Sequence, residues 1–170
     1  MEVVLFRHAQ KGITPFEDPE LTAEGLRQAE MIATLVAKKI IPPPTHAWAS
    51  PKIRTSQTLQ PACESRQIKI QKTDFLNLRS DRETSLVFNR RIAEFLLQFE
   101  KNKTAHSSET HFLCTHYDWI EEAMTLINCD KDLNSFEYSH WAPTQFIVFE
   151  ITQAHWKLVR KGSAHAAIID

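Results

Sequence analysis

Two histidines in this sequence each follow a short apolar stretch. Val3–Phe6 stops at Arg7 and His8, and His111–Cys114 is followed closely by His116. Continuous apolar stretches of this length are typical of strands in a parallel sheet that is covered on both faces. Ligands of such sheets bind outside the carboxyl ends of the strands. Both histidines are therefore predicted to meet at one edge of the sheet, next to the cation of Arg7.

A second arginine is predicted at the same edge. Ser50-Pro51 indicates a helix start, with Ser50 as the N-cap and Pro51 at the first helical position. Arg54 then lies in the opening turn, near the positive end of the helix dipole, where backbone amides could add further donors. The planar guanidinium groups of Arg7 and Arg54 suit the oxygens of a phosphoryl group.

This set of side chains predicts phosphoryl transfer through a covalent intermediate. Cations beside His8 should disfavour its protonated form, which leaves a neutral imidazole able to attack phosphorus. His116 could stabilise charge on the transferring oxygens. The predicted chemistry needs no metal and no cofactor.

The remaining elements predict a mostly parallel α/β sheet. Loop 10–20 is predicted to pass over the mouth of the first strand, and Thr22 to cap a helix that Pro42–Pro44 ends. Further strands are predicted at His46–Ala49 and Ile68–Ile70, further helices over Pro51–Glu64, Phe88–Phe99 and Tyr117–Ile127, and a closing hairpin at Gln145–Thr152 and His155–Lys161.

Composition sets limits on the class of protein. The chain has 170 residues, of which 42% are hydrophobic, and a formal net charge of −1. These values predict one domain over residues 1–170, with no general affinity for nucleic acid or membranes. Cys63, Cys114 and Cys129 lack the spacing of a disulfide framework or a zinc site, and no targeting or membrane-spanning segment is apparent, so a cytoplasmic location is expected.

Competing chemistries lack their motifs. The sequence has no Gly-x-x-x-x-Gly-Lys or Gly-x-Gly-x-x-Gly nucleotide loop, no Gly-x-Ser-x-Gly elbow and no His-Glu-x-x-His helix. Cys114 has no arginine placed to form a thiolate phosphatase loop and is predicted to be a small buried residue of a strand.

Three ordered segments resemble the histidine phosphatase superfamily, which has the phosphoglycerate-mutase-like fold. Arg7-His8-Ala9 looks like its Arg-His-Gly signature, Leu21–Ala29 like its first helix start, and Ser50–Thr58 like its phosphate-binding helix, while His116 falls where its second histidine belongs. The resemblance implies a three-layer α/β/α sandwich in which His8 is phosphorylated and Arg7, Arg54, His8 and His116 hold the phosphate.

Within the superfamily, the short interval before His116 is most similar to the small SixA-type phosphohistidine phosphatases. The expected substrate is then a phosphorylated protein or a small-molecule phosphate. The resemblance gives no unmistakable match to the glutamate that protonates the leaving group in larger relatives. Glu83 and Asp81 are candidates by position, and Asp118 is a third.

Two alternatives to a phosphatase stay open. Ala9 replaces the glycine of the signature, and Tyr117 follows the second histidine. Together with the uncertain acid, Ala9 allows an idle phosphate-binding or protein-interaction module of the same fold. A phosphoglycerate-mutase-type phosphotransferase is disfavoured because the chain lacks the helical insertion of the mutases.

Overall fold

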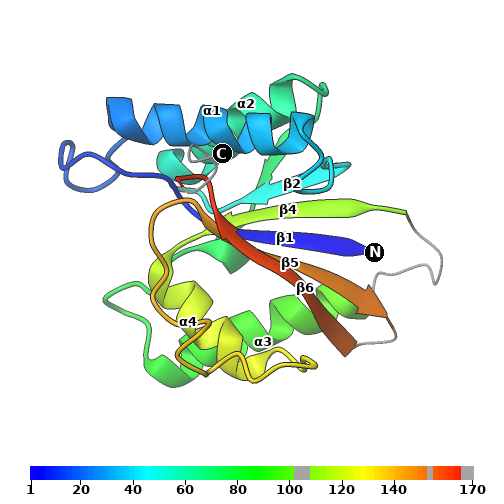
Figure 1. Ribbon diagram of the computed structural model, residues 1–170. Helices are drawn as coiled ribbons and strands as arrows, with labels where there is room; N and C mark the ends of the chain where they lie inside the picture. The colour runs from blue at the N-terminus through cyan, green and yellow to red at the C-terminus, as the bar shows by residue number, and fades with distance from the viewer. Residues whose placement is uncertain (102–107, 153–154, 166–170) are drawn as a thin grey trace.

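A computed structural model describes residues 1–101, 108–152 and 155–165 of the chain. These residues form a six-stranded sheet with helices on both faces (Figure 1). In chain order the elements are β1 Glu2–Arg7, α1 Ala23–Ala37, β2 His46–Ala49, α2 Ile53–Glu64, β3 Ile70–Lys72, the 3-10 helix η1 Asp74–Leu76, α3 Ser85–Lys101, β4 Thr110–Thr115, α4 Tyr117–Leu126, β5 Gln145–Thr152 and β6 His155–Ser163.

The sheet is mostly parallel, as predicted. The strand order is β3-β2-β4-β1-β5-β6. The pairs β3/β2, β2/β4 and β4/β1 are parallel, whereas β5 runs antiparallel to both β1 and β6. The carboxyl ends of β1, β2 and β4 consequently share one edge, which brings together the segments that follow them.

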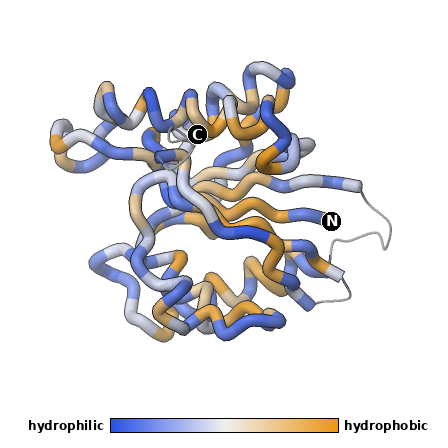
Figure 2. The backbone as a smooth tube through the Cα atoms, in the orientation of Figure 1, coloured by the Kyte–Doolittle hydropathy of each residue, from blue (hydrophilic) through white to orange (hydrophobic). Residues whose placement is uncertain are grey.

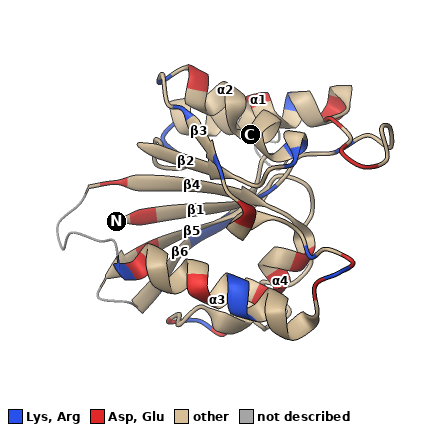
Figure 3. Ribbon diagram, turned by 180° about the vertical axis from the view of Figure 1, so that it is seen from behind, with Lys and Arg blue, Asp and Glu red and all other residues tan. Residues whose placement is uncertain are grey.

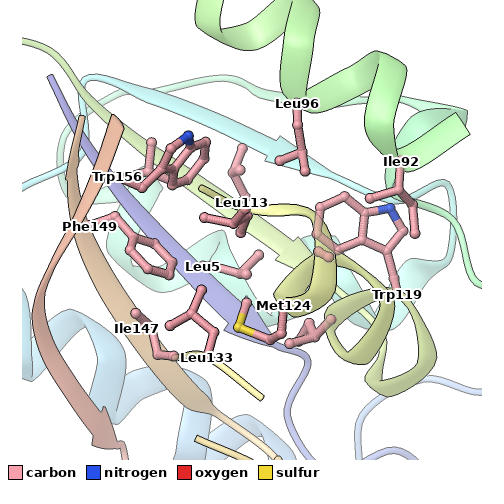
Figure 4. Packing of buried hydrophobic residues seen from close by; sticks show 14 of the residues in the cluster. Leu5, Ile92, Leu96, Leu113, Trp119, Met124, Leu133, Ile147, Phe149 and Trp156 are labelled. Carbon is pink, nitrogen blue, oxygen red and sulfur yellow. The ribbon is translucent and has the colours of Figure 1, made fainter. Parts of the chain in front are cut away.

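Alternating side chains of β1 serve two separate cores, which explains its unbroken apolar stretch. Val4 and Phe6 pack in a cluster with residues of α1 and α2. Val3 and Leu5 point to the opposite face, into a cluster with residues of α3 and α4. Figure 4 shows this second cluster, in which Leu5 and Leu113 of the sheet meet Trp119 and Met124 of α4. The sequence therefore forms three layers, with α1 and α2 on one side of the sheet and α3 and α4 on the other.

Apolar residues follow the central strands, and charged residues lie mainly on the outer helices and loops (Figures 2 and 3). The strand β4 contains no Asp, Glu, Lys or Arg, and all six of its residues are buried. None of the described helices is both long and apolar enough to cross a membrane.

Most predicted elements are confirmed, with shifts at their ends. The first helix has Thr22 as its N-cap, whose hydroxyl accepts from the Gly25 amide, and it ends at Ala37. The third strand was placed too early and lies at Ile70–Lys72. The predicted start of the second helix was wrong, because the helix begins at Ile53 with Lys52 as its N-cap. Ser50 is used elsewhere, as described below.

Gly25 on α1 permits a close approach to the loop that precedes the helix. A Cβ atom at Gly25 would lie 2.1 Å from the backbone oxygen of Gln10 and 3.1 Å from Cβ of Leu21. Gly25→Ala should therefore lower the free energy of unfolding by about 1–3 kcal/mol, although alanine normally favours a helix interior. Urea unfolding measures the change.

Gly12→Ala is the matched control. Its added Cβ would meet no atom nearer than 3.5 Å, the Glu20 oxygen, so stability should change by no more than about 0.5 kcal/mol. Equal stabilities of the two variants would show that the chain between Gln10 and α1 moves aside at no cost.

Candidate active site

The two histidines lie side by side at the carboxyl ends of β1 and β4. His8 follows β1 and His116 follows β4, and their ring centroids are 5.3 Å apart in an edge-to-face arrangement. The His8 amide donates to the Thr115 carbonyl at 3.1 Å, which ties the two strand ends together. Both side chains are buried, with 5% of His8 and 3% of His116 exposed.

The hydrogen bond of His8 fixes which ring nitrogen can react. His8 Nδ1 lies 2.7 Å from the carbonyl oxygen of Ala9. A carbonyl oxygen can only accept, so Nδ1 carries the proton and donates it. The neutral ring then has its lone pair on Nε2. The geometry makes Nε2 the nucleophilic atom of His8.

Arg54 and Ser50 fix the tautomer of His116 in the same way. Arg54 Nη2 is 3.2 Å from His116 Nδ1, and a guanidinium can only donate. His116 Nδ1 is therefore the acceptor, and Nε2 carries the proton. That proton points to the Ser50 hydroxyl at 2.8 Å. Ser50 was predicted to be a helix cap, but its Oγ instead holds His116 and also accepts from the Lys52 amide at 3.2 Å.

Burial is the main reason that both histidines are neutral. It lowers the pKa of His8 to about 4, with smaller contributions from the charges of Arg54 and Arg7. It lowers the pKa of His116 to about 2, again with smaller contributions from His8 and Arg54. The predicted effect of the arginines thus has the expected direction, but desolvation exceeds it.

The pKa of His8 predicts a pH dependence of stability. An imidazole in the unfolded chain has a pKa of about 6.5, so the unfolded state binds more protons between pH 6.5 and 4. Above that window His8 is neutral in both states and the free energy of unfolding is at its full value. As the pH falls through the window, protonation favours the unfolded state and the free energy of unfolding decreases. Between pH 7 and 4.5 the wild type should lose about 2 kcal/mol more than His8→Gln. Urea unfolding at both pH values tests this, and parallel losses would contradict the lowered pKa.

Arg7 and Arg54 flank the histidines from different elements. Arg7 ends β1, its Nη1 donates to the Trp141 carbonyl, and its guanidinium lies over the ring of Tyr117, 5.3 Å from the centroid. Arg54 lies in the first turn of α2, with 5% of its surface exposed. The Nε atoms of both arginines are buried and have no hydrogen-bond partner among the described residues. Buried donors without partners are costly and uncommon.

Asp18 is a site residue that the sequence analysis did not single out. Both of its carboxylate oxygens lie 3.2 Å from the Ile53 amide, and Oδ1 is 3.5 Å from Arg54 Nη1. Asp18 therefore satisfies the amide at the start of α2 that was predicted to be open for phosphate. The sequence did not point to Asp18 because this residue lies in the predicted loop, 10–20, and belongs to no recognisable motif.

Ala9 adopts a conformation that does not require glycine. It is fully buried, its amide donates to the Thr58 hydroxyl at 2.9 Å, and it is not among the residues with positive φ. The Thr58 hydroxyl donates in turn to the Arg54 carbonyl at 2.7 Å. Alanine at this position thus keeps the turn joined to α2.

The three candidate acids lie in different surroundings. Glu83 forms a bidentate ion pair with Arg91, with Nε to Oε1 at 2.8 Å and Nη2 to Oε2 at 2.9 Å. This pairing lowers the pKa of Glu83, which keeps the carboxyl ionised. Asp81 is exposed. Asp118 lies in the first turn of α4, where it accepts from the Arg79 amide at 2.8 Å. Its negative charge favours the charged form of Arg54 and so partly opposes the lowering of the Arg54 pKa by burial.

Comparison with known proteins agrees with this geometry. The family model described as the histidine phosphatase superfamily (branch 1) matches residues 3–80, which include Arg7, His8 and Arg54. The resemblance to the histidine phosphatase superfamily is confirmed. No curated protein sequence matches the chain.

Solved structures share the fold over nearly the whole chain. The protein histidine phosphatase SixA complexed with tungstate superposes with a TM-score of 0.73 at 12% identity, covering 98% of this chain and 99% of that one. A protein from Agrobacterium tumefaciens described as a phosphohistidine phosphatase SixA gives 0.70 at 22% identity, with 95% and 97% covered. The phosphoserine phosphatase H9A mutant of Entamoeba histolytica, in complex with phosphoserine, gives 0.69 at 15%, with 96% and 97% covered. At these identities the likeness establishes the phosphoglycerate-mutase-like fold.

Proposed function

We propose that this protein is a phosphatase that hydrolyses its substrate through a phosphohistidine on Nε2 of His8. The observation that carries the proposal is a neutral His8, with its lone pair on Nε2, close to His116 and to the charges of Arg7 and Arg54. A tetrahedral phosphoryl group is an acceptor of the right charge for the two guanidinium groups. The family match and the tungstate-bound SixA neighbour support the same reading.

The reaction takes place in two displacements. His8 Nε2 attacks phosphorus, forming the N–P bond, while the leaving group departs with the electron pair of its bond to phosphorus and takes up a proton from solvent. Arg7 and Arg54 stabilise the charge on the phosphoryl oxygens. His116, whose N–H is held by the Ser50 hydroxyl, accepts from Arg54 and orients its guanidinium group. Water then attacks phosphorus and releases a proton to solvent, the N–P bond breaks, and its electron pair returns to His8. The product is inorganic phosphate.

We propose phosphohistidine in a protein as the substrate class. Of the three candidate acids, Glu83 is held ionised by Arg91, which makes it a poor proton donor. An alkoxide leaving from a phosphate ester needs a proton far more than an imidazole does. A phosphoramidate is therefore the substrate class that demands least of the candidate acids. The free thiols of the three cysteines fit a reducing compartment such as the cytoplasm. We also propose that residues 1–170 act as one domain.

The test compares leaving groups in the absence of added metal. We expect turnover of a phosphohistidine peptide and of an aryl phosphate, whose phenolate leaves readily, and slower turnover of a serine phosphate ester by about 100-fold or more. Equal rates for all three would show that an acid operates, and Asp118→Asn and Glu83→Gln would then identify it. Absence of turnover with all three would favour the idle binding module, and transfer of phosphate between hydroxyls would favour the mutase.

A further inference from the structure

A second group of side chains lies at the opposite edge of the same strands. His46 is the first residue of β2, and it pairs with His111 of β4, where Glu109 precedes the strand. One ligand atom from each of these three residues lies within 4.8 Å of the other two. His111 and His116 are five positions apart along the chain, which is roughly 16 Å in an extended strand. The cluster is thus separate from the phosphate site and unused by the proposed reaction.

The surroundings of His46 leave one of its ring nitrogens free to act as a ligand. The Thr45 hydroxyl accepts from the Thr110 amide at 3.0 Å and donates to the Thr110 carbonyl at 3.1 Å. Its remaining contact is with His46 Nδ1 at 2.9 Å. When the hydroxyl proton is given to the Thr110 carbonyl, Nδ1 is the donor in this contact. The lone pair of His46 is then on Nε2. An imidazole whose other N–H is held in this way is the usual form of a metal ligand.

His111 and Glu109 complete a set of two imidazoles and one carboxylate. His111 Nε2 is 3.3 Å from Glu109 Oε2. The rings of His46 and His111 stack with centroids 4.6 Å apart and planes 9° from parallel. Phe99 packs edge-on against His111, with centroids 5.0 Å apart. The His111 ring is thus held in place by contacts on two sides.

We propose that His46, Glu109 and His111 bind a divalent first-row transition metal ion such as Zn²⁺. Two imidazole nitrogens and a carboxylate oxygen are favourable ligands for Zn²⁺, Ni²⁺ and Cu²⁺, whereas Mg²⁺ and Ca²⁺ prefer oxygen ligands alone. Glu109 supplies negative charge at the same end of the sheet as Glu2, the first residue of β1 (Figure 3). Water would occupy the remaining coordination position.

Binding requires two small rearrangements. An ion bound at about 2.0–2.1 Å by two imidazoles lies near the plane of each ring. Stacked rings with nearly parallel planes do not allow this, so half-buried His46 must turn toward His111. Coordination through His111 Nε2 also moves the proton of that ring to Nδ1. The Trp48 Nε1 contact with Nδ1, already long at 3.4 Å, must then open. Trp48 therefore lies where its fluorescence should report the binding of a quenching ion such as Ni²⁺ or Cu²⁺.

The test is calorimetric titration of the metal-free protein with Zn²⁺, together with thermal unfolding. We expect one ion per chain and, at a hundredfold excess over Kd, a rise in Tm of about 5 °C or more. Both His46→Asn and Glu109→Gln should weaken binding at least about tenfold. Both residues are only partly buried, so the variants should fold. If His46→Asn nevertheless affects folding, Glu109→Gln still tests the site, because it keeps the shape of the side chain. His140→Asn, which removes an exposed histidine elsewhere, should bind Zn²⁺ as the wild type does.

Two results would overturn the proposal. One is a Zn²⁺ affinity that is the same in Glu109→Gln and His46→Asn as in the wild type. The other is a Zn²⁺ affinity that disappears in His8→Ala, which would place the ion on the catalytic histidines instead. Trp48→Phe should still bind one metal ion per chain. It should lose the part of the Ni²⁺-induced quenching of tryptophan fluorescence that increases with occupancy of this site.

Discussion

Replacing His8 with alanine should abolish turnover, lowering kcat/KM for an aryl phosphate by at least about a thousandfold. The variant lacks the Nε2 lone pair that the Ala9 hydrogen bond directs away from the backbone. The arginines would still bind the phosphoryl group, so the loss should fall mainly on kcat. Initial rates over a range of substrate concentrations separate the two parameters.

The covalent intermediate gives a second measurement on the same variant. Wild-type protein mixed with labelled substrate and quenched in alkaline denaturant should retain the label, because a phosphohistidine is stable in base and labile in acid. His8→Ala should retain none. His155→Ala, in which an exposed histidine of β6 is removed, should match the wild type in both experiments. Label on a chain that lacks His8 would move the nucleophile to another residue.

The fold could be predicted from the sequence because the sheet is buried on both faces. Val3–Phe6 contributes alternate residues to the two cores, and such a strand must be apolar throughout. Parallel strands then bring their carboxyl ends together. His8 and His116 are distant in sequence, yet this rule places both at one edge of the sheet. The pairing of β1 with β4 then makes them neighbours. The sequence could therefore predict those residues of the site that directly follow a strand.

Contacts made by loops and hydroxyl groups could not be predicted in this way. Ser50 has the sequence context of a helix cap, but the helix starts three residues later, and the serine hydroxyl lies next to His116. Asp18 reaches the start of α2 from a loop whose path depends on tertiary packing. Only the three-dimensional path of the loop decides which polar group satisfies which amide.

Charge alone was also insufficient to choose the general acid. Glu83 and Asp81 share a short charged segment, and their spacing does not reveal that Arg91, on the next helix, holds Glu83. The same Arg91 donates to the carbonyls of Asp74, Phe75 and Asn77, so it anchors the segment before Glu83 as well. The pair thus has a structural explanation that needs no catalytic role.

Replacing Arg54 with lysine should lower kcat/KM by about a hundredfold or more while the charge of the site is kept. Arg54 directs one Nη atom to His116 and the other to Asp18, and its buried Nε has no partner among the described residues. A lysine ammonium is a single point and cannot reproduce this fork. Inhibition by inorganic phosphate or tungstate should weaken along with catalysis, because the lost donors also hold the ground-state oxyanion.

Arg27→Lys is the matched control for that substitution. Arg27 is exposed on α1, where it pairs with Glu24 at 2.7 Å, so the same chemical change there should leave kcat/KM within about twofold. If Arg54→Lys also stayed within that range, charge alone would suffice at the site and the fork would be unnecessary. A loss in kcat/KM without any change in oxyanion inhibition would instead assign Arg54 to the orientation of His116. The two measurements together therefore distinguish a residue that binds phosphate from one that positions the second histidine.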